Sequence, residues 1–227
     1  MRDRARVLTL LEELEQADAE KSAQVNELHE LLERVRTVRG NATGVQVTQA
    51  DLPARRARAE ESLGRTRAEV DAARAALAEA QEAVRSAGKE EQRRAELFEV
   101  RARDRLSVAE RRVAEGETDL EAIDKAGRQL EAFAVELEAD GKALANALHG
   151  RPNLAKEAGL APGPGPEGLL TWAEAAHAAL FVARGQAMAE QEAVIRQANE
   201  LGSAVLGEPL GAASVAVVAR RIETAAD

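Results

Sequence analysis

The feature that most constrains the fold is the run of residues 53–149, where no proline follows Pro53 and apolar residues recur every three or four positions. That spacing places apolar side chains on one stripe of an α-helix, as in the seam of a coiled coil. At about 1.5 Å per residue, one helix over this range would be roughly 145 Å long, far beyond the width of a compact domain. The sequence therefore predicts an elongated helical protein.

The composition supports helices with narrow cores. Alanine, leucine, glutamate and arginine are abundant, and all four are strong helix formers. Aromatic residues make up only 2% of the chain, so a thick aromatic core is not available and burial must come from seams between helices. Charged residues at 31% and hydrophobic residues at 45% are typical of coiled coils. We expect an all-α fold, an elongated antiparallel coiled coil.

A first helix is predicted over residues 3–38, where apolar residues follow heptad spacing from Val7 and Leu11 to Val35. Asp18 and Lys21 occupy two seam positions at which the heptads call for apolar residues. Two interpretations are open for this pair. The residues form a polar layer that sets register or partner choice, or they mark a solvated break in a loose coil.

Residues 39–52 are predicted to form a loop. Gly40 would end the first helix, and residues 45–48 alternate between apolar and polar side chains as in an extended segment. Asp51 and Pro53 then offer an N-cap and a first-turn proline for the next helix.

The next helix is predicted to be continuous over residues 53–149. Its heptads slip between Val84 and Leu106, with Phe98 on the seam, and a helix can absorb such stutters. Residues 89–92 offer no serine, threonine, aspartate or asparagine to cap a new helix, which favours continuity. The alternative is a three-helix bundle in which the chain reverses at Gly88.

Helix lengths predict how the segments pair. The first helix matches residues 53–88 in length, and residues 169–227 match residues 89–149. Proline and glycine crowd residues 150–168, which form a second loop. Because short loops give antiparallel neighbours, we predict two hairpins joined through the long central helix. They are residues 1–88 with loop 39–52, and residues 89–227 with loop 150–168.

No group of side chains in the sequence indicates a catalytic, cofactor-binding or metal-binding site. The chain has no cysteine, its three histidines are far apart, and the glycines of residues 163–168 alternate with prolines that have no N–H for phosphate. We therefore expect no catalytic, cofactor-binding or metal-binding residues, and no enzyme activity.

One segment carries local positive charge on a chain whose net charge is −9. Arginines outnumber acids in residues 93–112, and arginine contacts to phosphate position a nucleic acid without reading its sequence. The alternative is an exposed helix surface on which arginines form ion pairs with acidic residues one helical turn away. The arginines that would contact phosphate are Arg93, Arg94, Arg101, Arg105 and Arg112.

These features together predict a non-enzymatic structural or adaptor coiled coil that binds a protein partner or itself, without a cofactor. The alternative function is a nucleic-acid-associated accessory protein that uses the arginines of residues 93–112. No apolar run is long enough for a membrane span or a secretory signal, which predicts a cytoplasmic protein with no membrane partner.

Overall fold

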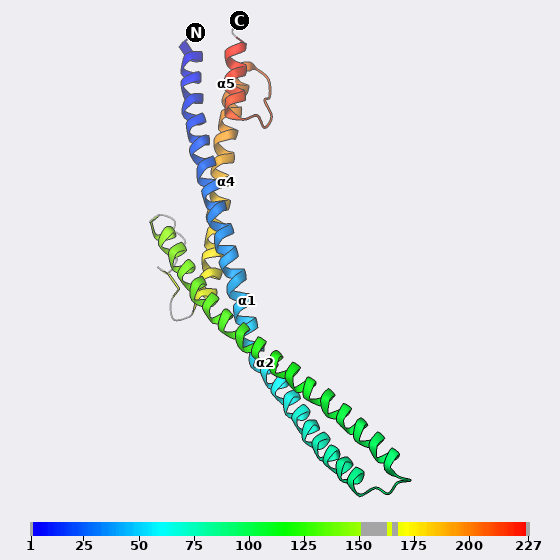
Figure 1. The fold of residues 1–227 in the computed structure, drawn as a ribbon. Coiled ribbons are helices and arrows are strands. Elements are labelled where there is room, and N and C mark those ends of the chain that lie inside the picture. The colour runs from blue at the N-terminus through cyan, green and yellow to red at the C-terminus, as the bar shows by residue number, and fades with distance from the viewer. Residues whose placement is uncertain (1, 151–162, 165–167, 226–227) are drawn as a thin grey trace. The chain divides into compact units, whose positions relative to one another are not determined.

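A computed structural model describes residues 2–150, 163–164 and 168–225, with side chains from residue 5 onward. Within these residues the chain forms four helices and no strand, so the predicted all-α fold is confirmed. The helices are α1 (Arg2–Ser86), α2 (Gln92–His149), α4 (Leu169–Leu206) and α5 (Val215–Thr224). In Figure 1, α2 runs antiparallel to the second half of α1 and α4 runs antiparallel to the first half of α1, whereas α5 runs parallel to α4.

The chain divides into two compact units. We call residues 43–136 the hairpin unit; it contains the second half of α1 and most of α2. We call residues 1–42 and 137–227 the terminal unit; it combines the first half of α1, the end of α2, α4 and α5. These boundaries differ from the predicted division at residue 88 because α1 and α2 each contribute to both units.

The predicted loop at residues 39–52 is wrong, because α1 continues through it as helix. The apolar seam also continues, with Val38, Ala42 and Val45 buried at heptad spacing. Burial at these positions outweighs the helix-propensity cost of Gly40 and its neighbours, about 1 kcal/mol per glycine. Consequently the first 38 residues do not fold back onto residues 53–88.

Continuity over residues 53–149 is also wrong: α1 ends at Ser86 and α2 begins at Gln92. The N–H groups of Glu91 and Gln92 both donate to the Gly88 carbonyl at 3.0 Å. The backbone thus closes the turn without the side-chain cap whose absence favoured a continuous helix. The reversal at Gly88 is the alternative that the structure shows.

Ion pairs between the two helices fix the register of the hairpin unit. Arg56 approaches Asp124 at 3.3 Å, and nearer the turn Arg74 approaches Glu110 at 3.2 Å. Partner numbers in α2 fall as those in α1 rise, the signature of an antiparallel pair. Each pair is more than a third exposed and contributes about 0–1 kcal/mol, so burial holds the helices together. The buried seam residues include Leu63, Val70 and Ala80 of α1 and Ala102 and Ala109 of α2.

The terminal unit has its core where α5 packs beside α4 and the start of α1 (Figure 1). The predicted face of the last helix is confirmed, since Val215, Val218 and Ile222 are all buried. A Cβ on Gly202 of α4 would collide with the side chains of Leu210 and Val218, so only glycine lets α5 approach this closely. The fully buried members of this core are Leu11, Ala198, Val215, Val218 and Ile222.

The predicted loop at residues 150–168 lies mostly outside the described residues. Its borders agree with the helix ends: α2 stops at His149, and the Gly150 N–H donates to the Asn146 carbonyl at 3.0 Å. Gly168 precedes α4 with φ 89°, a left-handed conformation that glycine adopts without steric cost.

Candidate interaction surface

The five arginines predicted to contact phosphate lie exposed along α2 in the hairpin unit. Arg112 reaches Glu69 of α1 at 3.5 Å. Among the described residues, the other four arginines form no ion pair, so ion pairing within the chain does not account for them. They are Arg93, Arg94, Arg101 and Arg105. Their proposed contact with phosphate stays a prediction.

Large apolar side chains share this exposed part of α2. Leu97 is 57% exposed, Phe98 52% and Val100 53%, whereas Ala102 on the seam is only 5% exposed. Phe98 was predicted on the seam, and that position is wrong. Because α2 starts anew at Gln92, its heptads need no stutter, and the seam passes through Glu99, whose side chain is only 22% exposed. The surface therefore combines unpaired arginines with apolar groups in water.

Asp18 and Lys21 are brought together with α4 of the terminal unit. Gln191 Nε2 donates to Asp18 Oδ1 at 3.0 Å, and Lys21 Nζ forms an ion pair with Glu190. The predicted hairpin of residues 1–88 would have set Asp18 and Lys21 opposite Val70 and Ala73, a pairing that the continuity of α1 excludes. Such part-exposed contacts set register more than they add stability. The role of this pair as a register-setting layer stays a prediction.

A half-buried histidine of α4, His177, lies near the part of α1 that carries Arg36 and Arg39. Burial lowers the pKa of His177 below its ordinary value, and the charges of Arg39 and Arg36 lower it further. Glu33 opposes them by favouring the protonated ring. Protonation of His177 is therefore less favourable in the folded chain than in the unfolded one.

This lowered pKa predicts a pH-dependent loss of stability. The stabilisation is complete above the unfolded histidine pKa of about 6.5 and is lost as pH falls through the lower folded pKa. When the pH is lowered from 7 to 5, the Tm of His177→Gln should fall by about 1–3 °C less than the Tm of the original chain. This difference corresponds to a contribution under about 1 kcal/mol. Thermal melts by circular dichroism measure this, with exposed His29→Gln as control. Equal losses in all three proteins would show that His177 does not titrate as described.

No sequence pattern pointed to Asn199, the polar residue whose side chain holds the loop between α4 and α5. Its side chain is 8% exposed. Asn199 Nδ2 donates to the Ala213 carbonyl at 2.8 Å, and Oδ1 accepts from the Ala213 N–H at 3.2 Å. An asparagine next to the apolar Ala198 within a helical seam was the only available signal.

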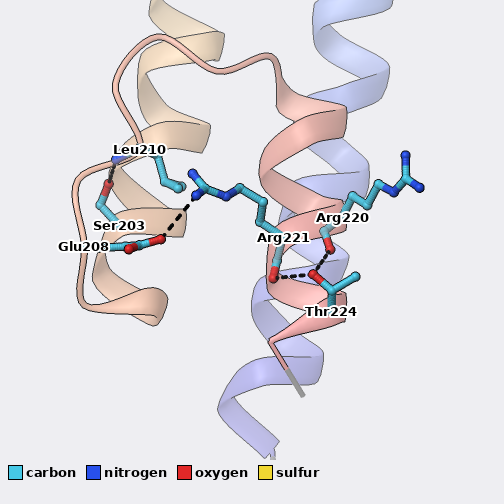
Figure 2. Close-up of polar contacts among 6 residues, drawn as sticks. All are labelled: Ser203, Glu208, Leu210, Arg220, Arg221 and Thr224. Carbon is cyan, nitrogen blue, oxygen red and sulfur yellow. Dashed lines mark hydrogen bonds and ion pairs between the residues drawn. The ribbon is translucent and has the colours of Figure 1, made fainter. Parts of the chain in front are cut away.

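Two further contacts tie the same loop down, as Figure 2 shows. The Leu210 N–H donates to Ser203 Oγ at 3.1 Å. Arg221 points from α5 toward Glu208 and pairs with it at 3.4 Å, whereas Arg220 points away. A groove lined by Ile195, Asn199 and Leu210 lies beside this loop. Two polar side chains that line this groove, those of Asn199 and Ser203, form hydrogen bonds with backbone groups of the loop.

A second groove lies within the hairpin unit where Leu52 and Pro53 of α1 face Ile123 and Gly127 of α2. Pro53 has no N–H to donate to the Gln49 carbonyl one turn earlier. In the part of the chain that the structure describes, no three histidine, aspartate or glutamate side chains gather closely enough to hold a metal ion. Packing and charge pairing are thus what these surfaces can offer a partner.

No protein-family model, curated protein or solved structure matches this chain. Among the described residues, no helix is both long and apolar enough to cross a membrane.

Proposed function

We propose that this protein is a non-enzymatic structural or adaptor coiled coil whose outer helix faces bind protein partners, a second copy of the chain included. The carrying observation is the exposed apolar surface of α2, where Leu97, Phe98 and Val100 are each more than half exposed. The seam of α2 already packs on α1, so these side chains add nothing to the core of the hairpin. Phe98 and Val100 flank the seam on its two sides and Leu97 lies opposite it, so this part of α2 offers exposed apolar groups to a partner on more than one face.

Apolar groups among the arginines favour a protein partner over a phosphate backbone. Phosphate binding needs cations and gains little from exposed aliphatic side chains such as Leu97 and Val100. A partner helix can cover Leu97 and Phe98 and place carboxylates beside Arg94 and Arg101, which lie between them on the helix surface. The proposed role requires no catalytic group and no cofactor, and we place it in the cytoplasm.

A photo-cross-linking residue at position 98 tests this function in cells. Asn26, exposed on α1 in the terminal unit, is the control position. We expect protein adducts from Phe98 and none from Asn26. Equal adduct yields at both positions, or no adduct at either, would contradict a binding role for the apolar surface.

The unpaired arginines favour nucleic acid as the second candidate. Retention on double-stranded DNA would then fall steeply between 50 and about 200 mM salt, as counterion release requires. It would also be lost on replacing Arg94, Arg101 and Arg105 by glutamate. Our proposal expects no retention with such a salt dependence, and observing it would establish the second candidate in place of the first.

A further inference from the structure

A second heptad stripe runs along the outer surface of α2. It starts at Arg94 and reaches Glu136 by alternating steps of four and three residues, and every side chain on it is exposed. Each position directly precedes a seam position, so it lies about 100° around the helix from the seam that faces α1. We call these positions the outer stripe. A helix docked on the outer stripe would lie beside α1 without displacing it.

Charge is segregated along the outer stripe. Its first half, the basic arm, carries four arginines and two apolar residues and has no acid: Arg94, Phe98, Arg101, Arg105, Val108 and Arg112. Its second half, the acidic arm, carries no base. Its seven positions are Glu115, Asp119, Ala122, Ala126, Gln129, Phe133 and Glu136.

The apolar residues of the two arms lie at similar distances on either side of the middle of the stripe. Phe98 stands near the start of the basic arm at 52% exposure, and Phe133 stands near the end of the acidic arm at 42%. Val108, 49% exposed, is as far before the middle of the stripe as Ala122 is after it. An antiparallel copy would therefore set Phe98 near Phe133 and Val108 near Ala122. It would also set Arg94 near Glu136 and Arg112 near Asp119, whereas Arg101 and Arg105 would face the uncharged Gln129 and Ala126.

We propose that two copies of the chain associate through the outer stripe of α2, antiparallel, with the two-fold axis near Glu115. This arrangement brings Phe98 close to Phe133 of the second copy and Arg94 close to Glu136 of the second copy. The interface is isologous, since each copy contributes one basic and one acidic arm. Knobs at heptad spacing on both helices allow the close packing that a coiled coil requires.

A parallel pairing through the same stripe is disfavoured by its charges. It would set Arg94, Arg101 and Arg105 against the same residues of the second copy, and like charges across an interface cost several kcal/mol. The antiparallel arrangement keeps one like-charge contact, between the two copies of Glu115 at the axis. It places Arg94 and Arg112 opposite Glu136 and Asp119 and leaves Arg101 and Arg105 facing uncharged residues. The segregation of charge therefore selects both the partner and its direction.

This inference rests on the proposed function, because it names a second copy as one protein partner of the exposed α2 surface. Different results would contradict the protein-binding role of this surface and the self-association. A chain that stays monomeric in solution but gives protein adducts from position 98 in cells would overturn the self-association alone.

Single cysteines test the direction of pairing, since the full chain has no cysteine of its own. With a short thiol cross-linker, Glu115→Cys should link two chains, because position 115 lies near the two-fold axis. Phe98→Cys alone should not, because an antiparallel pair separates the two copies of position 98 by about 50 Å. Phe98→Cys combined with Phe133→Cys should link them again. Cross-linking of Phe98→Cys alone would show a parallel pair and overturn the proposal.

Charge reversal tests the partner arms, with solution mass by analytical ultracentrifugation as the readout. Reversing the two arginines that face carboxylates (R94E, R112E) should weaken the dimer at least ~10-fold, as should reversing those carboxylates (D119K, E136K). Both sets in one chain should restore it. A control with the same change in charge as the first set, placed off the stripe (R93E, R111E), should leave the dimer intact. A monomeric original chain, or no restoration in the combined variant, would overturn the proposal.

Discussion

Asn199→Ala should lower the free energy of unfolding of the terminal unit by about 2–4 kcal/mol. The side chain of Asn199 satisfies both the N–H and the carbonyl of Ala213, and it also donates to the Ile195 carbonyl at 2.7 Å. Alanine would leave these partly buried backbone groups without partners, at about 1–3 kcal/mol for each.

The loss should be local to α5 and its loop. Hydrogen exchange in the folded chain should show faster exchange at the amides of Val218 and Ile222, with the hairpin unit unaffected. Gln197→Ala is the matched control, since Gln197 is an exposed amide on the same helix. Equal protection in both variants would mean that Asn199 does not hold the loop.

Leu11→Ala should destabilise the terminal unit by about 2–5 kcal/mol, the usual cost of truncating a fully buried leucine. Leu11 is 0% exposed and packs in the same cluster as Val218 and Ile222, so its removal opens a cavity between α1 and α5. Leu10→Ala is a close control, because Leu10 is the adjacent residue and is 38% exposed. Chemical denaturation monitored by circular dichroism measures both.

The difference between Leu10 and Leu11 is what the packing of α1 on α5 requires. If both alanine variants lost similar stability, the start of α1 would not pack on α5 through Leu11. A loss confined to Leu11→Ala supports the arrangement of the terminal unit.

Heptad periodicity predicted the helical class and the buried face of α5, because burial along a thin seam follows sequence spacing directly. Turn residues proved less reliable. Gly40 and Pro53 lie inside α1, where the continuing seam of Val38, Ala42 and Val45 outweighs their helix-breaking tendency. At Gly88 a continuous helix was predicted but the chain turns, because backbone hydrogen bonds close a turn that has no side-chain cap.

The candidate surface was predictable in part. The excess of arginine on residues 93–112 is a property of the sequence alone. The exposure of Phe98 is not, because it depends on where α2 begins: a helix that starts at Gln92 sets its own register, and the seam then passes through Glu99. Asn199 was beyond prediction, since its partner Ala213 is brought near only by the fold of the loop.

The register of the hairpin unit underlies the whole account, because it decides which face of α2 is free. A Cβ on Gly116 would lie 3.8 Å from the Cβ of Leu63, the separation that a disulfide requires. Leu63→Cys with Gly116→Cys should therefore form a disulfide within one chain, identified by mass spectrometry of the linked peptides. A continuous helix would hold these positions about 80 Å apart. Absence of this disulfide, with Asp18→Cys and Val70→Cys linking instead, would contradict the account.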